Sequence, residues 1–143
     1  MKQDDVLYCE ALLRKVGQRL FAEFAQEPAC TSKQAMNERF HALNPQAEEL
    51  LRHGLAERFP AYRWSDAELD ASLQKQPEYS TPYWICDAID GAVHFLQGMP
   101  MWAVSLCLVR DGQTAVSFVY DPCRDEMFTA IARQGAFFEW QQN

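Results

Sequence analysis

The chain has 143 residues, about the length of one domain, with 13 Lys and Arg against 20 Asp and Glu and a net charge of −7. This acidic balance argues against binding to nucleic acid or to an anionic membrane, because both depend on clustered Lys and Arg. Apolar residues make up 48% of the chain, which excludes disorder for most of it. No segment approaches the ~20 apolar residues of a membrane span, and the N-terminus lacks an apolar signal-peptide core. We expect a single cytoplasmic domain over residues 1–143.

The cysteines and histidines show no pattern typical of a metal site. The five cysteines are odd in number, and none forms a C-x-x-C pair. They are predicted to be buried, reduced thiols rather than disulfides or zinc ligands. The three histidines also lack metal-ligand spacing, so a zinc enzyme is not expected.

The first part of the chain has helical periodicity. In residues 4 to 25 the apolar side chains recur three and four positions apart, at Val6, Cys9, Leu13, Val16, Leu20 and Phe24. This spacing predicts a helix that ends at Glu27-Pro28, since the residue before a proline is disfavoured in the α region.

A second helix is predicted after a polar stretch, Thr31 to Arg39, which we interpret as a loop. Asn44-Pro45 is typical of a helix N-terminus, with Asn44 as the N-cap and proline in the first turn. The helix is expected to end at Phe59-Pro60. Residues 65 to 80 are polar without a sustained period, and such long connections are more often functional than idle.

The last part of the chain predicts a sheet. Short apolar segments predict five strands, at residues 83–86, 102–109, 114–120, 126–130 and 136–140. The link Arg110-Asp111-Gly112-Gln113 contains Asp-Gly, a strong hairpin-turn signal. Because the links between successive strands are short, we expect an antiparallel meander. Two helices packed on one face of that sheet give an α+β fold.

The candidate site is the segment Asp87-Ala88-Ile89-Asp90-Gly91, which follows the first of these strands. Two carboxylates three positions apart can converge on one hard cation, and the Ile89 carbonyl between them is a natural third oxygen ligand. Gly91 allows a ligand to approach the backbone, and the N–H groups of a helical turn beginning there would face an anion. A metal site beside an anion site is the arrangement of a metal-dependent phosphatase.

The D-x-x-D-G pattern by itself has a simpler interpretation. Asp90 can serve as the cap of a short helix, with Asp87 in a turn that Gly91 permits. The pattern is not the D-x-D-x-T motif of phosphatases that use an aspartate nucleophile, because its spacing differs.

The surrounding segments extend the pattern over nearly the whole chain. In order they are Trp84 to Phe95, Gly98 to Leu106, Val119-Tyr120-Asp121-Pro122, Glu126 to Ala130 and Gln134 to Phe137. They resemble the inositol monophosphatase family, whose motifs are W-x-x-D-P-[IL]-D-G-T-x-N-F, G-x-P-x-x-A-V-S, V-Y-D-P, E-[LM]-F-T-A and G-x-G-A. The resemblance corresponds to the N-terminal half of such an enzyme, and family members continue into a second domain.

This resemblance implies a set of site residues. Glu68 takes the place of the family's second metal-binding glutamate, which also helps to activate the attacking water. Asp87, the Ile89 carbonyl and Asp90 match the other metal ligands of this half, and the Gly91 and Ala92 amides match the phosphate-binding turn. Two residues correspond to positions near the site: Lys33 to a loop lysine and Asn44 to an acidic helix cap. The implied reaction is hydrolysis of a small phosphate monoester, such as inositol monophosphate, with Mg²⁺ and with inhibition by Li⁺.

The same comparison supports an alternative function. Ala67 replaces the family's first metal-binding glutamate, and Ala92 replaces the threonine that helps to orient the water. A chain without those groups and without a second domain is interpreted alternatively as a catalytically impaired relative that binds a metal or a partner. We also expect apolar surface on the uncovered sheet face, and therefore a homodimer or another partner on it.

Overall fold

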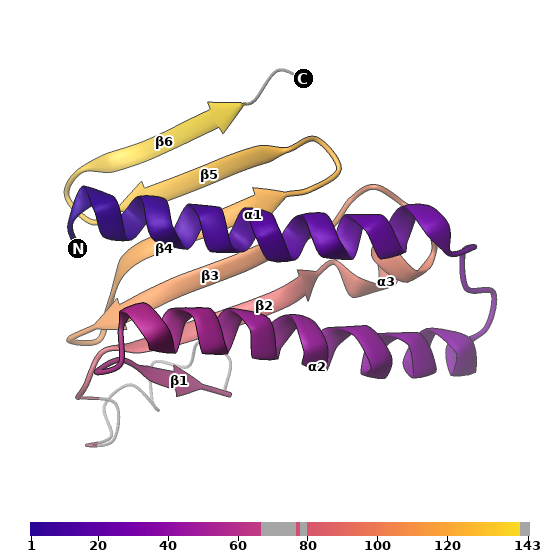
Figure 1. Ribbon diagram of the computed structural model, residues 1–143, viewed down its shortest axis with the longest axis horizontal. Helices are drawn as coiled ribbons and strands as arrows, with labels where there is room; N and C mark the ends of the chain where they lie inside the picture. The colour runs from indigo at the N-terminus through magenta and orange to yellow at the C-terminus, as the bar shows by residue number, and fades with distance from the viewer. Residues whose placement is uncertain (67–76, 78–79, 141–143) are drawn as a thin grey trace.

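Two long helices lie side by side in front of a sheet (Figure 1). The computed structural model describes residues 1–66, 77 and 80–140. Helix α1 spans Gln3–Gln26, as its apolar stripe predicts, and buries that stripe against β3 and β4. Helix α2 spans Lys33–Arg58, runs antiparallel to α1 and packs on β2.

The predicted start of α2 was wrong. The helix begins eleven residues before Asn44, at Lys33, and the N-cap is Ser32, whose Oγ accepts a hydrogen bond from the Ala35 amide at 3.1 Å. Asn44 therefore lies in the helix interior, where its amide donates to Glu48 Oε1 at 3.2 Å, and Pro45 is inside the helix. Tertiary packing explains the early start, since an apolar stripe crosses the supposed loop and packs on the core: Met36, Phe40, Leu43, Ala47, Leu51 and Leu55.

The described strands form one sheet in sequential order. They are β1 (Arg63–Ser65), β2 (Tyr83–Asp90), β3 (Ala103–Arg110), β4 (Gln113–Asp121), β5 (Glu126–Ile131) and β6 (Gly135–Trp140). The five predicted strands are confirmed, and each neighbouring pair among them is antiparallel. The sequence analysis missed β1, which pairs with β2 in parallel and makes the sheet mixed. The α+β prediction is confirmed with this addition.

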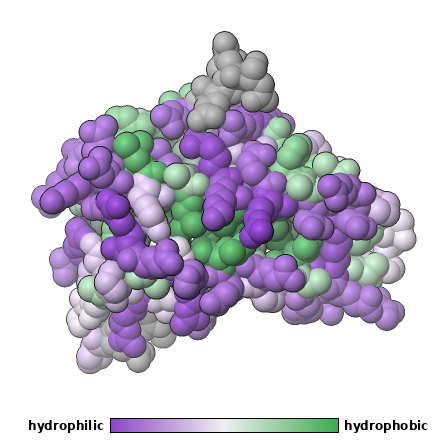
Figure 2. All heavy atoms as spheres, in the orientation of Figure 1, coloured by the Kyte–Doolittle hydropathy of each residue, from purple (hydrophilic) through white to green (hydrophobic). Residues whose placement is uncertain are grey.

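The core lies between the helices and one face of the sheet. Alternate residues of the strands point into it, and the largest buried side chains include Trp84, Leu106, Phe118 and Tyr120. Along the groove between α1 and α2, Figure 2 shows apolar atoms bordered by polar ones. No helix within the described residues is long and apolar enough to cross a membrane.

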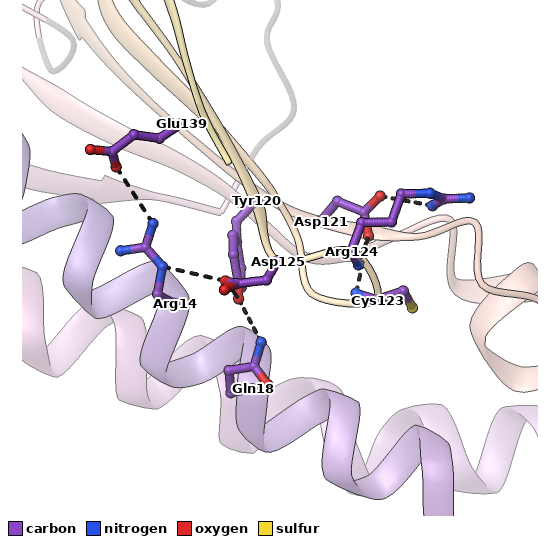
Figure 3. Close-up of polar contacts among 8 residues, drawn as sticks. All are labelled: Arg14, Gln18, Tyr120, Asp121, Cys123, Arg124, Asp125 and Glu139. Carbon is purple, nitrogen blue, oxygen red and sulfur yellow. Dashed lines mark hydrogen bonds and ion pairs between the residues drawn. The ribbon is translucent and has the colours of Figure 1, made fainter. Parts of the chain in front are cut away.

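A polar network fixes α1 on the sheet (Figure 3). The Tyr120 hydroxyl on β4 donates to Asp125 Oδ1 and accepts from Gln18 Nε2 on α1, both at 2.6 Å. Arg14 on α1 lies between two carboxylates, with Nε 3.5 Å from Asp125 Oδ1 and Nη2 3.6 Å from Glu139 Oε2. One helix face is thereby tied to β4, to the β4–β5 turn and to β6.

Candidate functional site

A β-bulge places the two candidate aspartates on the same side of the sheet. Asp87 pairs with Ser105 and Asp90 pairs with Ala103, so three steps along β2 match two steps along β3. In a regular strand, residues three apart point to opposite faces, and the one extra residue of a bulge cancels that alternation. Asp87 and Asp90 are accordingly both exposed, whereas Ala88 and Ile89 between them are buried.

Gly91 makes the turn from β2 into the short helix α3 (Ala92–Leu96). It has a left-handed backbone, with φ of 86°, and a Cβ on it would lie 2.7 Å from the Met101 carbonyl oxygen. Both facts require glycine here, because other residues disfavour positive φ and the carbonyl leaves no room. The Gly91 carbonyl accepts from the Phe95 amide at 3.0 Å, which closes the first turn of α3.

The loop after α3 is held beside this turn. Arg124 Nη1 donates to the Pro100 carbonyl at 3.2 Å and to Asp121 Oδ2 at 2.9 Å. Phe95 and Trp102 pack edge to face beneath the loop, with ring centroids 4.7 Å apart. The turn carrying Asp90 and Gly91 is therefore supported from both sides.

The thiol next to the aspartates is not a nucleophile in this arrangement. Burial raises the pKa of Cys86 well above its ordinary value, and the negative charges of Glu48 and Asp87 raise it further. Because thiolate is the reactive form of cysteine, Cys86 remains a neutral packing residue. The candidate ligands at this strand end are therefore carboxylate and carbonyl oxygens.

Lys33 and Asn44 lie at different distances along α2 from the end that meets α3. Lys33 is the first residue of the helix and is exposed, in the part of α2 that packs near α3. The linker before it is tied to α3 by the Cys30 amide, which donates to the Leu96 carbonyl at 2.8 Å. Asn44 is half-buried further along the helix and bonds to Glu48.

The predicted metal ligands are brought together only in part. Glu68 lies outside the described residues, as does Ala67. Across the described ranges, no three His, Cys, Asp or Glu side chains form a group that could hold a metal ion. Asp87, Asp90 and the Ile89 carbonyl are hard oxygen donors of the kind that Mg²⁺ binds through one or two carboxylates plus waters. The donor types fit Mg²⁺, and a third carboxylate would have to come from elsewhere.

The sequence analysis placed Ser105 in a strand and in a family motif, but not among the candidate site residues. It is the cross-strand partner of Asp87, so both side chains lie on the same sheet face. The antiparallel pairing of β2 with β3 could have placed the Ser105 hydroxyl beside the site. The bulge that sets the register of this pair was not visible in the sequence.

Comparison with known proteins gives the family of the chain. The profile of the inositol monophosphatase family matches residues 2–142. Inositol monophosphatase 3 of Solanum lycopersicum is 34% identical over 90 residues, which cover 63% of this chain and 34% of the relative. Inositol monophosphatase 1 of Sus scrofa is 27% identical over 140 residues, which cover 98% of this chain and 50% of the relative.

Solved structures show the same fold. Thermotoga maritima IMPase superposes with a TM-score of 0.71 at 24% identity, covering 98% of this chain and 53% of that one. The inositol monophosphate-bound SaIMPase-II superposes with a TM-score of 0.71 at 20% identity, covering 95% of this chain and 46% of that one. The chain thus spans about half the length of these relatives. With its family motifs in register along this fold, the chain belongs to the inositol monophosphatase family.

Proposed function

We propose that this chain supplies the metal- and phosphate-binding half of a Mg²⁺-dependent phosphomonoesterase. In this proposal residues 1–143 form one domain that corresponds to the N-terminal half of the family, and the substrate is a small phosphate monoester such as inositol monophosphate. The observation that carries it is the bulge in β2, which puts Asp87 and Asp90 on one exposed side directly before the Gly91 turn.

Each residue has a proposed role. Asp87, Asp90, the Ile89 carbonyl and Glu68 would hold the cation, which would supply Lewis-acid activation of a water and neutralise phosphate charge. The Gly91 and Ala92 amides bind phosphate oxygens, and Glu68 takes the proton of the attacking water. Lys33 and Asn44 are proposed to lie beside the site, where Lys33 would attract the phosphate. Li⁺ is expected to inhibit only if the chain is active.

Phosphate release from inositol 1-phosphate, with Mg²⁺ or with EDTA, tests the proposal. The variant is Asp90→Asn, which keeps the shape of the side chain and removes its charge. Asp111→Asn is the matched control, because Asp111 is an exposed aspartate in the β3–β4 turn with a φ of 54° that asparagine tolerates. Mg²⁺-dependent release that Asp90→Asn abolishes and Asp111→Asn retains supports the proposal. Release that is equal in both variants would contradict it.

A second candidate is binding of a metal or a partner without catalysis. Ala92, the first residue of α3, has no hydroxyl with which to orient a water. Removing one preorganised hydrogen-bond donor typically lowers a rate by about 10²–10³-fold. Calorimetric Mg²⁺ binding that Asp90→Asn weakens, in a protein that releases no phosphate, would favour this second candidate. Turnover restored by Ala92→Thr would favour the first.

We also propose that a second copy covers the open sheet face. Val119, Phe128 and Phe138 are cross-strand neighbours on the face opposite α1, with exposed fractions of 39%, 42% and 55%. A contiguous apolar patch of this kind marks an interaction surface. Light scattering should give a dimer for the unchanged protein and a monomer for Phe128→Glu. A monomer at all concentrations would exclude the homodimer and leave another partner as the occupant.

We place the protein in the cytoplasm. The five cysteines are free thiols, which is typical of a reducing compartment. Fractionation of cells that express the chain checks this placement.

A further inference from the structure

A cavity of about 410 Å³ lies between the N-terminal half of α1 and the outer strands β5 and β6, apart from the candidate site. Its walls are mainly apolar, and include Val6 and Leu7 of α1, Met127 and Ile131 of β5, and Phe137 of β6. Figure 2 shows apolar atoms at the surface between these elements. The volume is within the range of about 300–1,000 Å³ that small-molecule pockets occupy.

One carboxylate in this cavity is buried. The Glu10 residue is only 9% exposed, and its Oε1 accepts a hydrogen bond from the Thr129 hydroxyl at 2.7 Å. Glu10 belongs to none of the ion pairs formed between described residues. A buried carboxylate is costly unless it is paired with a cation and fully hydrogen-bonded, and one neutral hydroxyl meets that need only in part.

The charges around the cavity favour a cation. Glu139 also lines it, and that carboxylate is 3.6 Å from the Arg14 guanidinium, which compensates part of its charge. The described wall contains no lysine, arginine or histidine side chain, although Met1, which carries the α-ammonium group, also lines the cavity. Glu10 therefore sets a negative potential in a largely apolar environment, within a chain of net charge −7.

We propose that this cavity binds an organic ammonium ion with an apolar body. The ammonium group pairs with Glu10 and gives the buried carboxylate its missing partner. The apolar part packs between Leu7 and Phe137, which are 49% and 54% exposed without a ligand. A carboxylate or phosphate ligand is disfavoured, because it would meet a buried charge of its own sign.

Protein NMR with 2-phenylethylammonium as the probe tests the proposal, and 2-phenylethanol serves as the neutral probe of similar shape. We expect saturable amide shifts at Leu7, Thr129 and Phe137, and binding of the alcohol at least tenfold weaker. Glu10→Gln should weaken binding of the ammonium probe by a similar factor. Glu23→Gln, which removes the same charge from an exposed position of α1, should leave it unchanged.

Three results would overturn the proposal. Equal affinity for the ammonium and the alcohol would show an apolar pocket without charge selection. Shifts confined to Asp87 and Asp90 would show binding at the candidate metal site instead. Absence of saturable binding would show that the cavity is not a site for this class of ligand, for instance because another segment of chain fills it. The comparison of the two probes needs no variant, so it decides the matter even if Glu10→Gln fails to fold.

Discussion

The ring of Tyr120 lies directly against the backbone of Gly17, so that a Cβ on residue 17 would come within 2.5 Å of Tyr120 Cδ2. This close approach lets α1 lie flat on β4. It also brings Gln18, the next residue, within hydrogen-bonding distance of the Tyr120 hydroxyl. The glycine is therefore required by packing, although the backbone at that position is helical.

Gly17→Ala should lower the free energy of unfolding despite the higher helix propensity of alanine. Overpacking of a filled core typically costs about 1–3 kcal/mol, whereas the propensity gain is about 1 kcal/mol. Urea unfolding followed by circular dichroism gives the difference. Ala11→Gly, at an exposed position of the same helix, measures the propensity effect alone. If Gly17→Ala raised the free energy of unfolding by as much as Ala11→Gly lowers it, the packing argument would be contradicted.

Tyr120→Phe should flatten the loss of stability at high pH. Burial, aided by the hydrogen bond to Asp125, raises the pKa of Tyr120 from 10.0 to about 12. The tyrosine ionises at lower pH in the unfolded chain than in the folded one, so its contribution is present below pH 10 and is lost as the pH rises toward 12. Unfolding free energies measured from pH 8 to pH 11.5 should fall more steeply for the unchanged protein than for Tyr120→Phe. If the unfolding free energies of the two proteins fell in parallel with pH, the raised pKa of Tyr120 would be excluded.

Gly91→Ala should be more destabilising than Gly112→Ala. Both glycines have positive φ, 86° and 71°, and a side chain there costs roughly 1–2 kcal/mol. Only Gly91 also has a backbone carbonyl 2.7 Å from the added Cβ, whereas nothing lies within 4 Å at Gly112. The difference between the two unfolding free energies isolates that contact, and we expect about 1 kcal/mol or more. Equal losses would show that the turn can shift to admit a methyl group.

Cys9 should resist alkylation while the protein is folded. Its thiol is fully buried, and burial, with smaller effects of Asp5 and Glu10, raises its pKa to about 12. Thiolate is the reactive form, so at pH 8 the small thiolate fraction should make alkylation of Cys9 slow. Peptide mass spectrometry after iodoacetamide treatment should find Cys30, which is half-buried, modified before Cys9. In urea the two should react alike, and rapid native labelling of Cys9 would contradict the burial.

The hairpins were predictable because local turn chemistry determined them. Asp111 and Gly112 both have positive φ, as a two-residue hairpin turn requires, and the Asp-Gly dipeptide favours this conformation. The five strands around such turns followed from their apolar runs. Strand β1 has only three residues and owes its existence to pairing with β2, which no local signal in Arg63–Ser65 reveals.

The start of α2 was missed because the side chains of Thr31 to Arg39 are mostly polar. The helical spacing of the few apolar residues was therefore overlooked. The apolar residues there are few, but Met36 and Phe40 continue the stripe of Leu43, and Arg39 lies over the Phe95 ring at 5.4 Å. The Asn44-Pro45 pair was then misread as a helix start. A proline inside an α-helix loses one hydrogen bond, and here the contacts of the flanking turns offset that loss.

The candidate site residues could be named from the sequence, but the arrangement of Asp87 and Asp90 could not be predicted from it. The sequence analysis placed Asp87 and Asp90 after the strand, whereas both aspartates belong to β2 and a bulge aligns them. A bulge depends on the pairing of two strands, so it carries little signal in the sequence of one. The Glu10–Thr129 pair was missed for the same reason, because its members are 119 positions apart.

The order in which the chain is made has a consequence for α1. Its contacts with the sheet are long-range, and the Gln18–Tyr120 hydrogen bond spans 102 positions. At a synthesis rate of about 5–20 residues per second, α1 leaves the ribosome roughly 5–20 s before β4 exists to cover it. For most of that interval α2 is the described element available to its apolar stripe, since β3, which α1 also contacts, is made directly before β4. We therefore expect the apolar stripe of α1 to be most exposed at the stage of the nascent helical hairpin, until the meander of β2 to β6, which is built from neighbouring strands, covers it.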